Sequence, residues 1–496
     1  LRQSFMVLGR YSSVGWRALR RYYIPILLQW KIVKCLSLSI PSPPEREIFS
    51  VAPMMGHTNR HYHFFVRLFS QRAHLYTEMI PATQIVNLYQ SNPSALNELL
   101  RLQENSNPVC LQLGGYDIDT LAEAAAIGRD VFGYSGINLN CGCPSDAVFE
   151  RSGGAALMRD PTHVAAIVQR MSDVLRHDQV TISVKHRLGV TEAASYSKDN
   201  TNWNDLESFQ SCLNFVQIVS QAGCVQKFHV HARLALVGEW NSDDNTSNDL
   251  VADLATVKSK DAIESDNHDI LLPKVDHKRR QYKAKLNSRK ATIQNRKIPP
   301  LKPHIVQQLA EVMPHLEFVT NGGIQNLQDV QQILSQTTSS NMVGAMVGRA
   351  FINHPCSFAT VDELWDGHQP NQYLNKMKQY PTRKQILEAY ISYCEQEESR
   401  LLATDPPPAL LRRLRRSLVA VPYTILTGEK GGEAFQRRIR KLIVRPERHS
   451  ATAILQAAMA EVPQETWQRP ISEFFQHHPS YLEYQHRSGP LQRIIL

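Results

Sequence analysis

The chain has 496 residues, with 55 Lys and Arg against 46 Asp and Glu, so its formal net charge is +9. That length allows two or three domains with a full core, and the basic balance favours an anionic partner without identifying one. Eight scattered cysteines, with neither a CxxC pair nor a Cys/His metal spacing, argue against a zinc site and favour a reducing compartment.

The first 44 residues contain seven Lys and Arg and no Asp or Glu. Mixed with Ser and large apolar residues, this is typical of an organelle transit peptide. The apolar run from Tyr22 to Leu28 is too short to span a bilayer. We expect residues 1–45 to direct the protein to a mitochondrion or plastid. The alternative is a disordered tail or read-through of untranslated sequence, and the protein is then cytoplasmic.

From Ile48 onward, short apolar runs alternate with stretches of helical spacing. We expect strands near 48–53, 75–79, 109–113, 136–140, 181–185, 227–231, 317–321 and 343–347. We expect helices near 59–70, 94–103, 118–130, 161–176, 206–221, 303–313 and 326–336. Eight strands with helices between them predict a parallel α/β fold, and eight is the number that closes a (β/α)8 TIM barrel over residues 46–362.

The stretch from Gly136 to Asp146 is an apolar strand that runs into the loop Cys-Gly-Cys-Pro. Pro144 has no amide proton, so the strand cannot continue through it. A thiol at Cys143, close to the amides of Asn138 and Asn140, is a candidate proton donor to a bound ring. The alternative is a buried loop with structural cysteines.

Polar or glycine residues also follow nearly all of the remaining predicted strands. They lie at the end of the barrel where enzymes of this fold carry out chemistry. Each has an ordinary alternative, such as a turn cap, a solvated strand end or a core histidine, and the repetition at one end is the evidence. The residues are Pro53, Met54, Met55, Glu78, Gln112, Lys185, Arg187, His231, Arg233, Asn321, Gly322, Gly323, Gly348 and Arg349.

Glycines follow the seventh and eighth strands, at Asn321-Gly322-Gly323 and Gly348-Arg349. Loops at these two places commonly bind phosphate in barrels, because glycine lets backbone amides approach the anion. Arg349 would add a charge-assisted contact, and Asn326 is expected to cap the next helix. The pattern predicts a flat, phosphate-bearing cofactor across the barrel mouth, with two ordinary turns as the alternative.

Residues 241–296 interrupt the alternation with an Asp/Asn/Ser-rich half and a Lys/Arg-rich half. We expect a solvated insertion, with nucleic-acid contact by its basic half as the alternative. Residues 363–381 are expected to be a linker, and 382–496 a basic helical domain. In this domain we expect one helix over 382–400 and, from the prolines at 406–408, a second over 408–445. Arg412, Arg413, Arg415 and Arg416 form one basic cluster, and residues 437–441 contain another. Such a domain suggests a grip on phosphates of a nucleic acid, with a solvated helix face as the alternative.

Ten segments in the same order resemble the tRNA-dihydrouridine synthases, most closely the A-type branch that acts at D-loop positions 20 and 20a. The resemblance covers roughly residues 46–360 and, more faintly, 382–445. The segments are Ala52 to Met55, Tyr76 to Met79, Leu111 to Gly115, Asn138 to Asp146, Gly154 to Met158, Val184 to Arg187, His229 to Arg233, Ile298 to Leu301, Asn321 to Ile324 and Val347 to Arg349.

This resemblance implies an oxidoreductase in which NADPH reduces FMN and the C5–C6 double bond of a tRNA uridine is then reduced. Cys143 would be the general acid, and the FMN would be bound by Pro53, Met54, Met55, Gln112, Lys185, His231, Asn321, Gly322, Gly323, Gly348 and Arg349. The substrate nucleotide would lie near Asn140, Ser145, Asp146, Arg187 and Arg233. The expected partner is tRNA, with no metal and no membrane, and the expected state is a monomer.

The sequence departs from the family pattern in three places. The usual threonine between the strand-five Lys and Arg is His186, and the lysine often found after the His-Ala-Arg motif is Leu234. The insertion expands the loop that leads to Ile298. Two other functions stay open on these residues. One is a flavin oxidoreductase of free pyrimidines or of the dihydroorotate type, and the other is a catalytically inactive tRNA-binding protein.

Overall fold

The computed structural model describes residues 46–103, 106, 108–145, 153–175, 180–193, 196, 204–238, 299–337, 339–366 and 380–473. The predicted transit peptide, the predicted insertion, Asp146, most of the predicted linker and the chain beyond residue 473 lie outside these ranges. Within the described residues, no helix is both long and apolar enough to cross a membrane.

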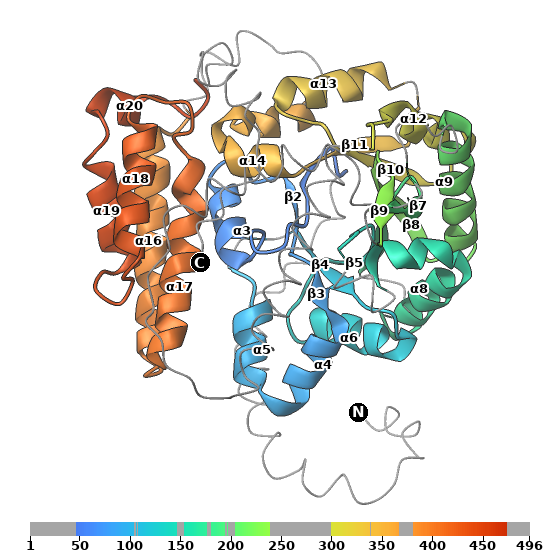
Figure 1. Ribbon diagram of the computed structural model, residues 1–496, viewed down its shortest axis with the longest axis horizontal. Helices are drawn as coiled ribbons and strands as arrows, with labels where there is room; N and C mark the ends of the chain where they lie inside the picture. Colours follow the sequence, from blue (N-terminus) through green and yellow to red (C-terminus); the bar gives the residue numbers. More distant parts are fainter. Residues whose placement is uncertain are drawn as a thin grey trace, which may run out of the picture. The chain divides into compact units, whose positions relative to one another are not determined.

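A closed parallel barrel forms the first part of the described chain (Figure 1). The strands pair in the order β2-β1-β11-β10-β8-β6-β5-β4-β3, and β2 also pairs with β4, which closes the ring. The strands are β1 Phe49–Val51, β2 His74–Tyr76, β3 Ile80–Pro81, β4 Val109–Gly114, β5 Gly136–Cys141, β6 Thr181–Arg187, β8 Val225–His231, β10 Glu317–Asn321 and β11 Met342–Val347. The predicted TIM barrel is confirmed.

Burial explains why these strands read as nearly continuous apolar runs. Every residue of β4, β5 and β11 is buried, as expected for parallel strands that are covered on both faces. The helices that surround the barrel are α3 Arg60–Arg67, α4 Ala82–Ser91, α5 Pro93–Leu100, α6 Ile118–Asp130, α8 Pro161–Leu175, α9 Asp205–Ser220, α12 Pro303–Val312, α13 Leu327–Gln336 and α14 Arg349–Asn353. Short 3-10 helices add η1 Gly154–Arg159, η4 Pro355–Phe358 and η5 Val361–Trp365.

The second predicted strand is shorter than expected and ends at Tyr76 instead of residue 79. The Thr77 side-chain oxygen accepts a hydrogen bond from the backbone N–H of Gln112 at 3.0 Å. A side chain therefore takes the place of a backbone carbonyl there, and regular pairing resumes only at β3. The sequence analysis also did not identify α4, nor the small parallel sheet of β7 Val190–Glu192 and β9 Ala235–Val237.

The C-terminal part is helical, as predicted, and contains α16 Arg383–Leu402, α17 Pro408–Ala420, η6 Val421–Thr424, α18 Gly432–Ile443, α19 Ala451–Met459 and α20 Gln464–Gln468. Thr382 and Gln385 form a capping box at the start of α16, and Pro408 is the first residue of α17. The single helical stretch expected over 408–445 is two helices. They are separated near Gly431, which has φ +84°, a value that favours glycine.

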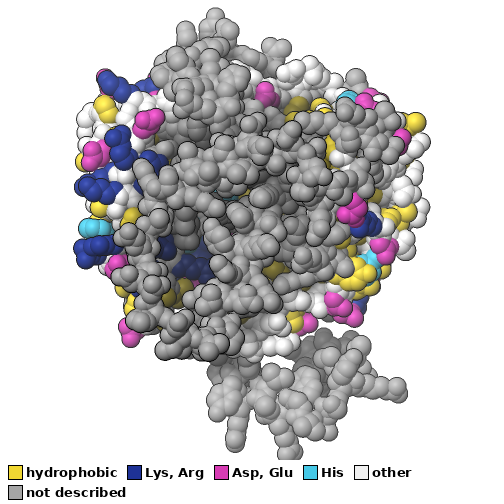
Figure 2. Space-filling model, in the orientation of Figure 1, with side chains coloured by type: hydrophobic (Ala, Val, Ile, Leu, Met, Phe, Trp, Pro, Cys, Tyr) yellow, Lys and Arg dark blue, Asp and Glu magenta, His cyan; other side chains and the backbone are white. Residues whose placement is uncertain are grey.

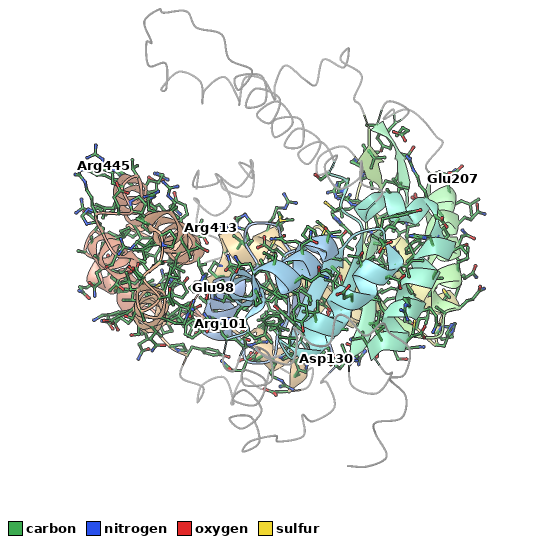
Figure 3. The ribbon with its side chains drawn as sticks, turned by 90° about the horizontal axis from the view of Figure 1, so that it is seen from below. Glu98, Arg101, Asp130, Glu207, Arg413 and Arg445 are labelled. Atoms are coloured by element: carbon green, nitrogen blue, oxygen red, sulfur yellow. The ribbon has the colours of Figure 1, made fainter. Side chains whose placement is uncertain are left out.

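This helical part packs against α3 and α5 of the barrel. Tyr393 stacks on Phe64 with ring centroids 4.0 Å apart, and its hydroxyl lies 2.7 Å from Nδ1 of His61. A charged group, here called the docking cluster, joins the same elements: Glu397 with Arg60, Arg101 and Arg400, and Glu98 with Arg60 and Arg400. Glu98 and Arg101 lie on the side of the barrel that faces the helical part (Figure 3).

Candidate active site

The barrel places the predicted residues of several strands at the same end. The register pairs Asn140 of β5 with Lys185 of β6. It also pairs Arg187 of β6 with His231 of β8, and His231 with Asn321 of β10. All of these positions are at the carboxyl ends of parallel strands. The repeated polar strand ends of the sequence therefore do converge on one mouth of the barrel.

The loop that carries Cys143, residues 142–145, is held by two side chains. The Asn140 side-chain oxygen accepts hydrogen bonds from the backbone N–H groups of Gly142 and Cys143, both at 3.0 Å. Nε of Arg187 donates to the carbonyl of Gly142 at 2.9 Å, and the Cys143 carbonyl accepts from the N–H of Ala155 at 2.9 Å. These bonds leave the backbone at Cys143 little freedom to move.

The thiol of Cys143 is suited to donating a proton. Burial raises its pKa above the ordinary value, although a backbone hydrogen bond at Ser145 and the positive charges of Arg187 and Lys185 act in the opposite direction. The residue is therefore a thiol at neutral pH. The two nearby cations would stabilise the thiolate that remains after proton transfer.

A chain of buried amides crosses the barrel interior beneath this loop. Gln112 donates to the side-chain oxygen of Asn138 at 2.7 Å and accepts from Asn140 at 2.9 Å. Asn138 in turn donates to the hydroxyl of Ser183 at 2.8 Å. Because these partners fix the orientation of the Gln112 amide, its remaining donor and acceptor capacity is available to a ligand in the mouth.

Four cations gather at the mouth: Lys185, Arg187, Arg233 and Arg349. Burial is the main reason that the pKa of His231 lies well below its usual value, and the four positive charges lower it further. This histidine is therefore neutral at neutral pH. Burial lowers the pKa of Lys185 to about 7, and Arg187 adds to the effect while Cys143 opposes it. A buried ammonium with a lowered pKa marks a place where an anion would bind favourably.

The polar partners of these cations are mostly neutral. Nζ of Lys185 donates to Oδ1 of Asn321 at 3.2 Å, and Arg233 donates to the carbonyl of Pro299. Within the described residues, no carboxylate forms an ion pair with Lys185, Arg233 or Arg349. Among the described residues, the mouth therefore carries a surplus of positive charge, which fits a phosphate or another anionic group.

The two glycines after β10 are required by their backbone conformation and by close packing. Gly322 has φ +115° and Gly323 has φ +78°. A Cβ on Gly322 would lie 2.8 Å from the ring of His231, and one on Gly323 would lie 2.5 Å from Leu301. Asn326 caps α13 through the N–H of Asp329, as predicted. Packing within the protein therefore accounts for these glycines, and a phosphate site at this turn stays a prediction.

The first strand leads into a tight turn, residues 54–58, here called the Met54 turn. The N–H of Met54 donates to the Thr58 hydroxyl at 2.9 Å, and the N–H of Thr58 donates to the Met54 carbonyl at 3.1 Å. The sulfur of Met54 faces Gly348, where an added Cβ would be 3.4 Å away. Met55 is 52 % exposed. Pro53 and Met54 are half-buried. Residues 53–55, here called the apolar wall, therefore border Gly348 of the predicted phosphate site through Met54.

Two residues predicted to contact substrate have internal partners. Arg187 is 6 % exposed and also donates to the carbonyl of Leu234 at 2.7 Å. It therefore joins the Cys143 loop to the loop that follows β8. Asn140 is 9 % exposed and holds the same loop. Sequence reasoning missed this supporting role, and contact of either residue with substrate stays a prediction. Ser145 belongs to the loop, and Asp146 lies outside the described residues.

Two of the departures from the family pattern, His186 and Leu234, are buried side chains, and the insertion lies outside the described residues. His186 is fully buried and lies between Phe215 of α9 and Phe228 of β8. Burial lowers its pKa to about 4. Leu234 is 2 % exposed and contributes its carbonyl to Arg187. His186 is therefore a core residue on the helix side of the barrel.

Basic side chains gather over the helical part, at the left of the molecule in Figure 2. Arg413 of α17 is exposed, as are Arg437, Arg440 and Lys441 of α18 and Arg445. Arg415 instead pairs with buried Glu398 at 3.1 Å, so one member of the predicted cluster has a structural partner. Within the described residues, no group of three His, Cys, Asp or Glu side chains could hold a metal ion.

Comparison with known proteins gives one consistent result. The family model described as dihydrouridine synthase matches residues 50–262 and 285–404. A Synechocystis protein named tRNA-dihydrouridine(20/20a) synthase is 35 % identical over 347 residues, which are 70 % of this chain and 78 % of the relative. Proteins of the same name from Vibrio vulnificus and Pasteurella multocida are 29 % and 34 % identical and cover 84 % and 71 % of this chain and 97 % and 80 % of their own.

Proposed function

This chain belongs to the dihydrouridine synthase family, and from that premise we propose a specific activity for it. It is a tRNA-dihydrouridine synthase that uses FMN and NADPH and reduces the C5–C6 double bond of a D-loop uridine at position 20 or 20a. The observation that carries the proposal is the Cys143 thiol, held by Asn140 and Arg187 beside a mouth with surplus positive charge.

The residues of the mouth fit FMN. Arg349, Asn321 and the backbone of Gly322, Gly323 and Gly348 would hold its phosphate. Gln112, Lys185 and His231 would contact the ring edge and ribityl chain, and Pro53, Met54 and Met55 would pack against the ring. When bound and reduced by NADPH, this group supplies the hydride for the reaction. The surplus of positive charge among the described residues of the mouth supports the assignment.

Cys143 completes the reduction. As hydride arrives at C6 of the uracil ring, the Cys143 thiol gives its proton to C5, and the product is dihydrouridine. The S–H bond breaks and a C–H bond forms, and the thiolate is later protonated again from solvent. Arg187 and Lys185 lower the cost of the transient thiolate, and the bonds at Gly142 and Cys143 keep the sulfur in place.

The helical part would hold the tRNA. Arg413 of α17 and Arg437, Arg440 and Lys441 of α18 present an exposed basic surface that suits phosphates rather than bases. A D-loop uridine in folded tRNA must be extruded to reach a barrel mouth. A grip on the surrounding phosphates would help to offset the free energy of that step.

The test is an absorbance spectrum of the purified protein, followed by NADPH and then unmodified tRNA. We expect a flavin spectrum that bleaches with NADPH and recovers faster with tRNA than with free uridine, and mass spectrometry should find two added hydrogens at position 20 or 20a. Equal recovery with small pyrimidines would favour a free-pyrimidine oxidoreductase. A colourless protein that binds tRNA but reduces nothing would favour an inactive RNA-binding protein.

A further inference from the structure

Glu78 follows β2 at the mouth of the barrel and has no part in the mechanism above. Its carboxylate accepts a hydrogen bond from the backbone N–H of Gly56 at 2.6 Å. Its own N–H donates to the carbonyl of Thr58 at 3.1 Å. Gly56 has φ +75°, so it lies at the bend of the Met54 turn. Glu78 therefore holds both the bend and the end of that turn.

Through the Met54 turn, the hydrogen bonds of Glu78 can affect the shape of the barrel mouth. Thr58 is fully buried and closes the turn through three hydrogen bonds with Met54. Met54 in turn faces Gly348, at the end of β11. A movement of the bend at Gly56 would therefore change the wall that borders the proposed FMN site. A hydrogen bond to a charged acceptor is stronger than one to a neutral acceptor, which makes a carboxylate effective here.

Helix α17 of the helical part reaches the same segment. The Ser417 hydroxyl accepts from the side-chain amide of Asn59 at 3.3 Å, and Asn59 caps α3 directly after the turn. Burial raises the pKa of Glu78, the Gly56 bond lowers it, and the charge of Arg413 lowers it further. Arg413 is exposed and lies on the side of the helical part that faces the barrel (Figure 3).

We propose that Glu78 is a positioning residue that sets the Met54 turn against bound FMN, and that α17 supports the same segment through the bond between Ser417 and Asn59. The inference rests on the proposed function, because it concerns the same cofactor. It adds that the helical part contributes to the flavin site of the free enzyme, before any tRNA is bound.

The experiment measures two properties of the flavin-loaded protein without tRNA. One is hydrogen–deuterium exchange of the peptide that contains residues 53–59, and the other is the FMN dissociation constant, from the flavin fluorescence released on dilution. Glu78→Ala should exchange faster in this peptide and bind FMN about 10-fold to 100-fold more weakly, as for loss of a hydrogen bond to a charged group. Glu78→Gln, which keeps an oxygen acceptor but no charge, should fall between Glu78→Ala and wild type.

Ser417→Ala, which removes the acceptor of the Asn59 side-chain amide, should shift both readouts in the same direction by less. The matched control is Glu207→Gln on α9, where a glutamate also accepts a backbone N–H, that of Asn204 at 2.8 Å, on the far side of the barrel from the helical part (Figure 3). It should change neither readout.

Wild-type exchange or wild-type FMN affinity in a folded Glu78→Ala protein overturns the inference. If that variant does not fold, the Glu78→Gln protein decides by the same criteria, and a Ser417→Ala protein with wild-type exchange removes α17 from the inference. A wild-type protein that binds no FMN would instead overturn the proposed function. The two failures are therefore distinguishable.

Discussion

Replacing Asn140 by alanine tests how the Cys143 loop is held. The substitution removes the acceptor of two backbone N–H groups, at Gly142 and Cys143, and a donor to Gln112. A buried donor left without a partner costs about 1–3 kcal/mol. Gly142 and Cys143 are only half-buried, so we take the lower part of that range for each. The free energy of unfolding should fall by roughly 2–4 kcal/mol for the two groups together.

The effect on turnover should be larger than the effect on binding. The freed loop no longer holds the Cys143 sulfur in place, and a displacement of about 1 Å can slow a reaction by about 10²-fold. We therefore expect kcat to fall by about that factor, with KM for tRNA and FMN affinity near wild type. A raised KM with unchanged kcat would instead show that Asn140 binds substrate directly, as the family resemblance implies.

Single-turnover formation of dihydrouridine and urea denaturation measure the two effects. The matched control is Asn92→Ala, which removes an exposed asparagine that caps α5 through one backbone N–H at 3.0 Å. It should cost about 1 kcal/mol of stability and leave turnover unchanged. If Asn140→Ala turns over at the wild-type rate and unfolds at the same urea concentration, the loop is not held in the way described.

Three further predictions concern other parts of the molecule. Cys143→Ala should slow turnover by about 10²–10⁴-fold, as for loss of a general acid, and should spare FMN binding; unchanged turnover would remove Cys143 from the mechanism. FMN should bind more tightly at pH 6 than at pH 9, because Lys185 has a pKa of about 7 in the free protein and loses its positive charge above that pH. A Lys185→Met protein should lose this pH dependence of FMN affinity. The same pH dependence in both proteins would contradict the assignment. Glu397→Ala should lower stability by about 3–5 kcal/mol, against little change for the exposed Glu388→Ala. Burial raises the pKa of Glu397, but Arg60 and Arg101 hold it at about 2. The stability difference between wild type and Glu397→Ala should therefore shrink as the pH falls from 4.5, and a difference that persists unchanged at pH 2 would refute the role of that charge.

The sign of the Glu397 effect follows from its charged state. A carboxyl group with a lowered pKa in the folded protein stabilises it above the pKa of the unfolded chain, and this contribution disappears as the pH falls through the lower value. The same sign applies to Lys185, over a different pH interval. Its pKa is lowered by burial, so the unfolded chain binds more protons between pH 7 and its ordinary value of 10.5. Its contribution to the stability of the free protein therefore increases with pH over that interval.

The sequence alone determined the elements whose signals are local. Apolar runs predicted the eight barrel strands, because strands buried on both faces must be apolar throughout. Cap chemistry located α13 at Asn326, and proline located the start of α17. The convergence of Cys143, Lys185, His231 and Asn321 was also predictable, since parallel strands of a closed barrel bring their carboxyl ends to one mouth.

The tertiary structure decided which partner each polar side chain has. Nothing local in the sequence connects Glu78 with Gly56, because the two residues lie on different segments that only the closed barrel brings together. Glu397 meets Arg60 and Arg101 only when the helical part packs on the barrel. The sequence also did not show that Asn140 and Arg187 hold the Cys143 loop, because a polar residue near a strand end has the same sequence signature whether it faces a ligand or the adjoining loop. Hydrogen bonds act over about 3 Å, and only the folded backbone determines which groups come that close.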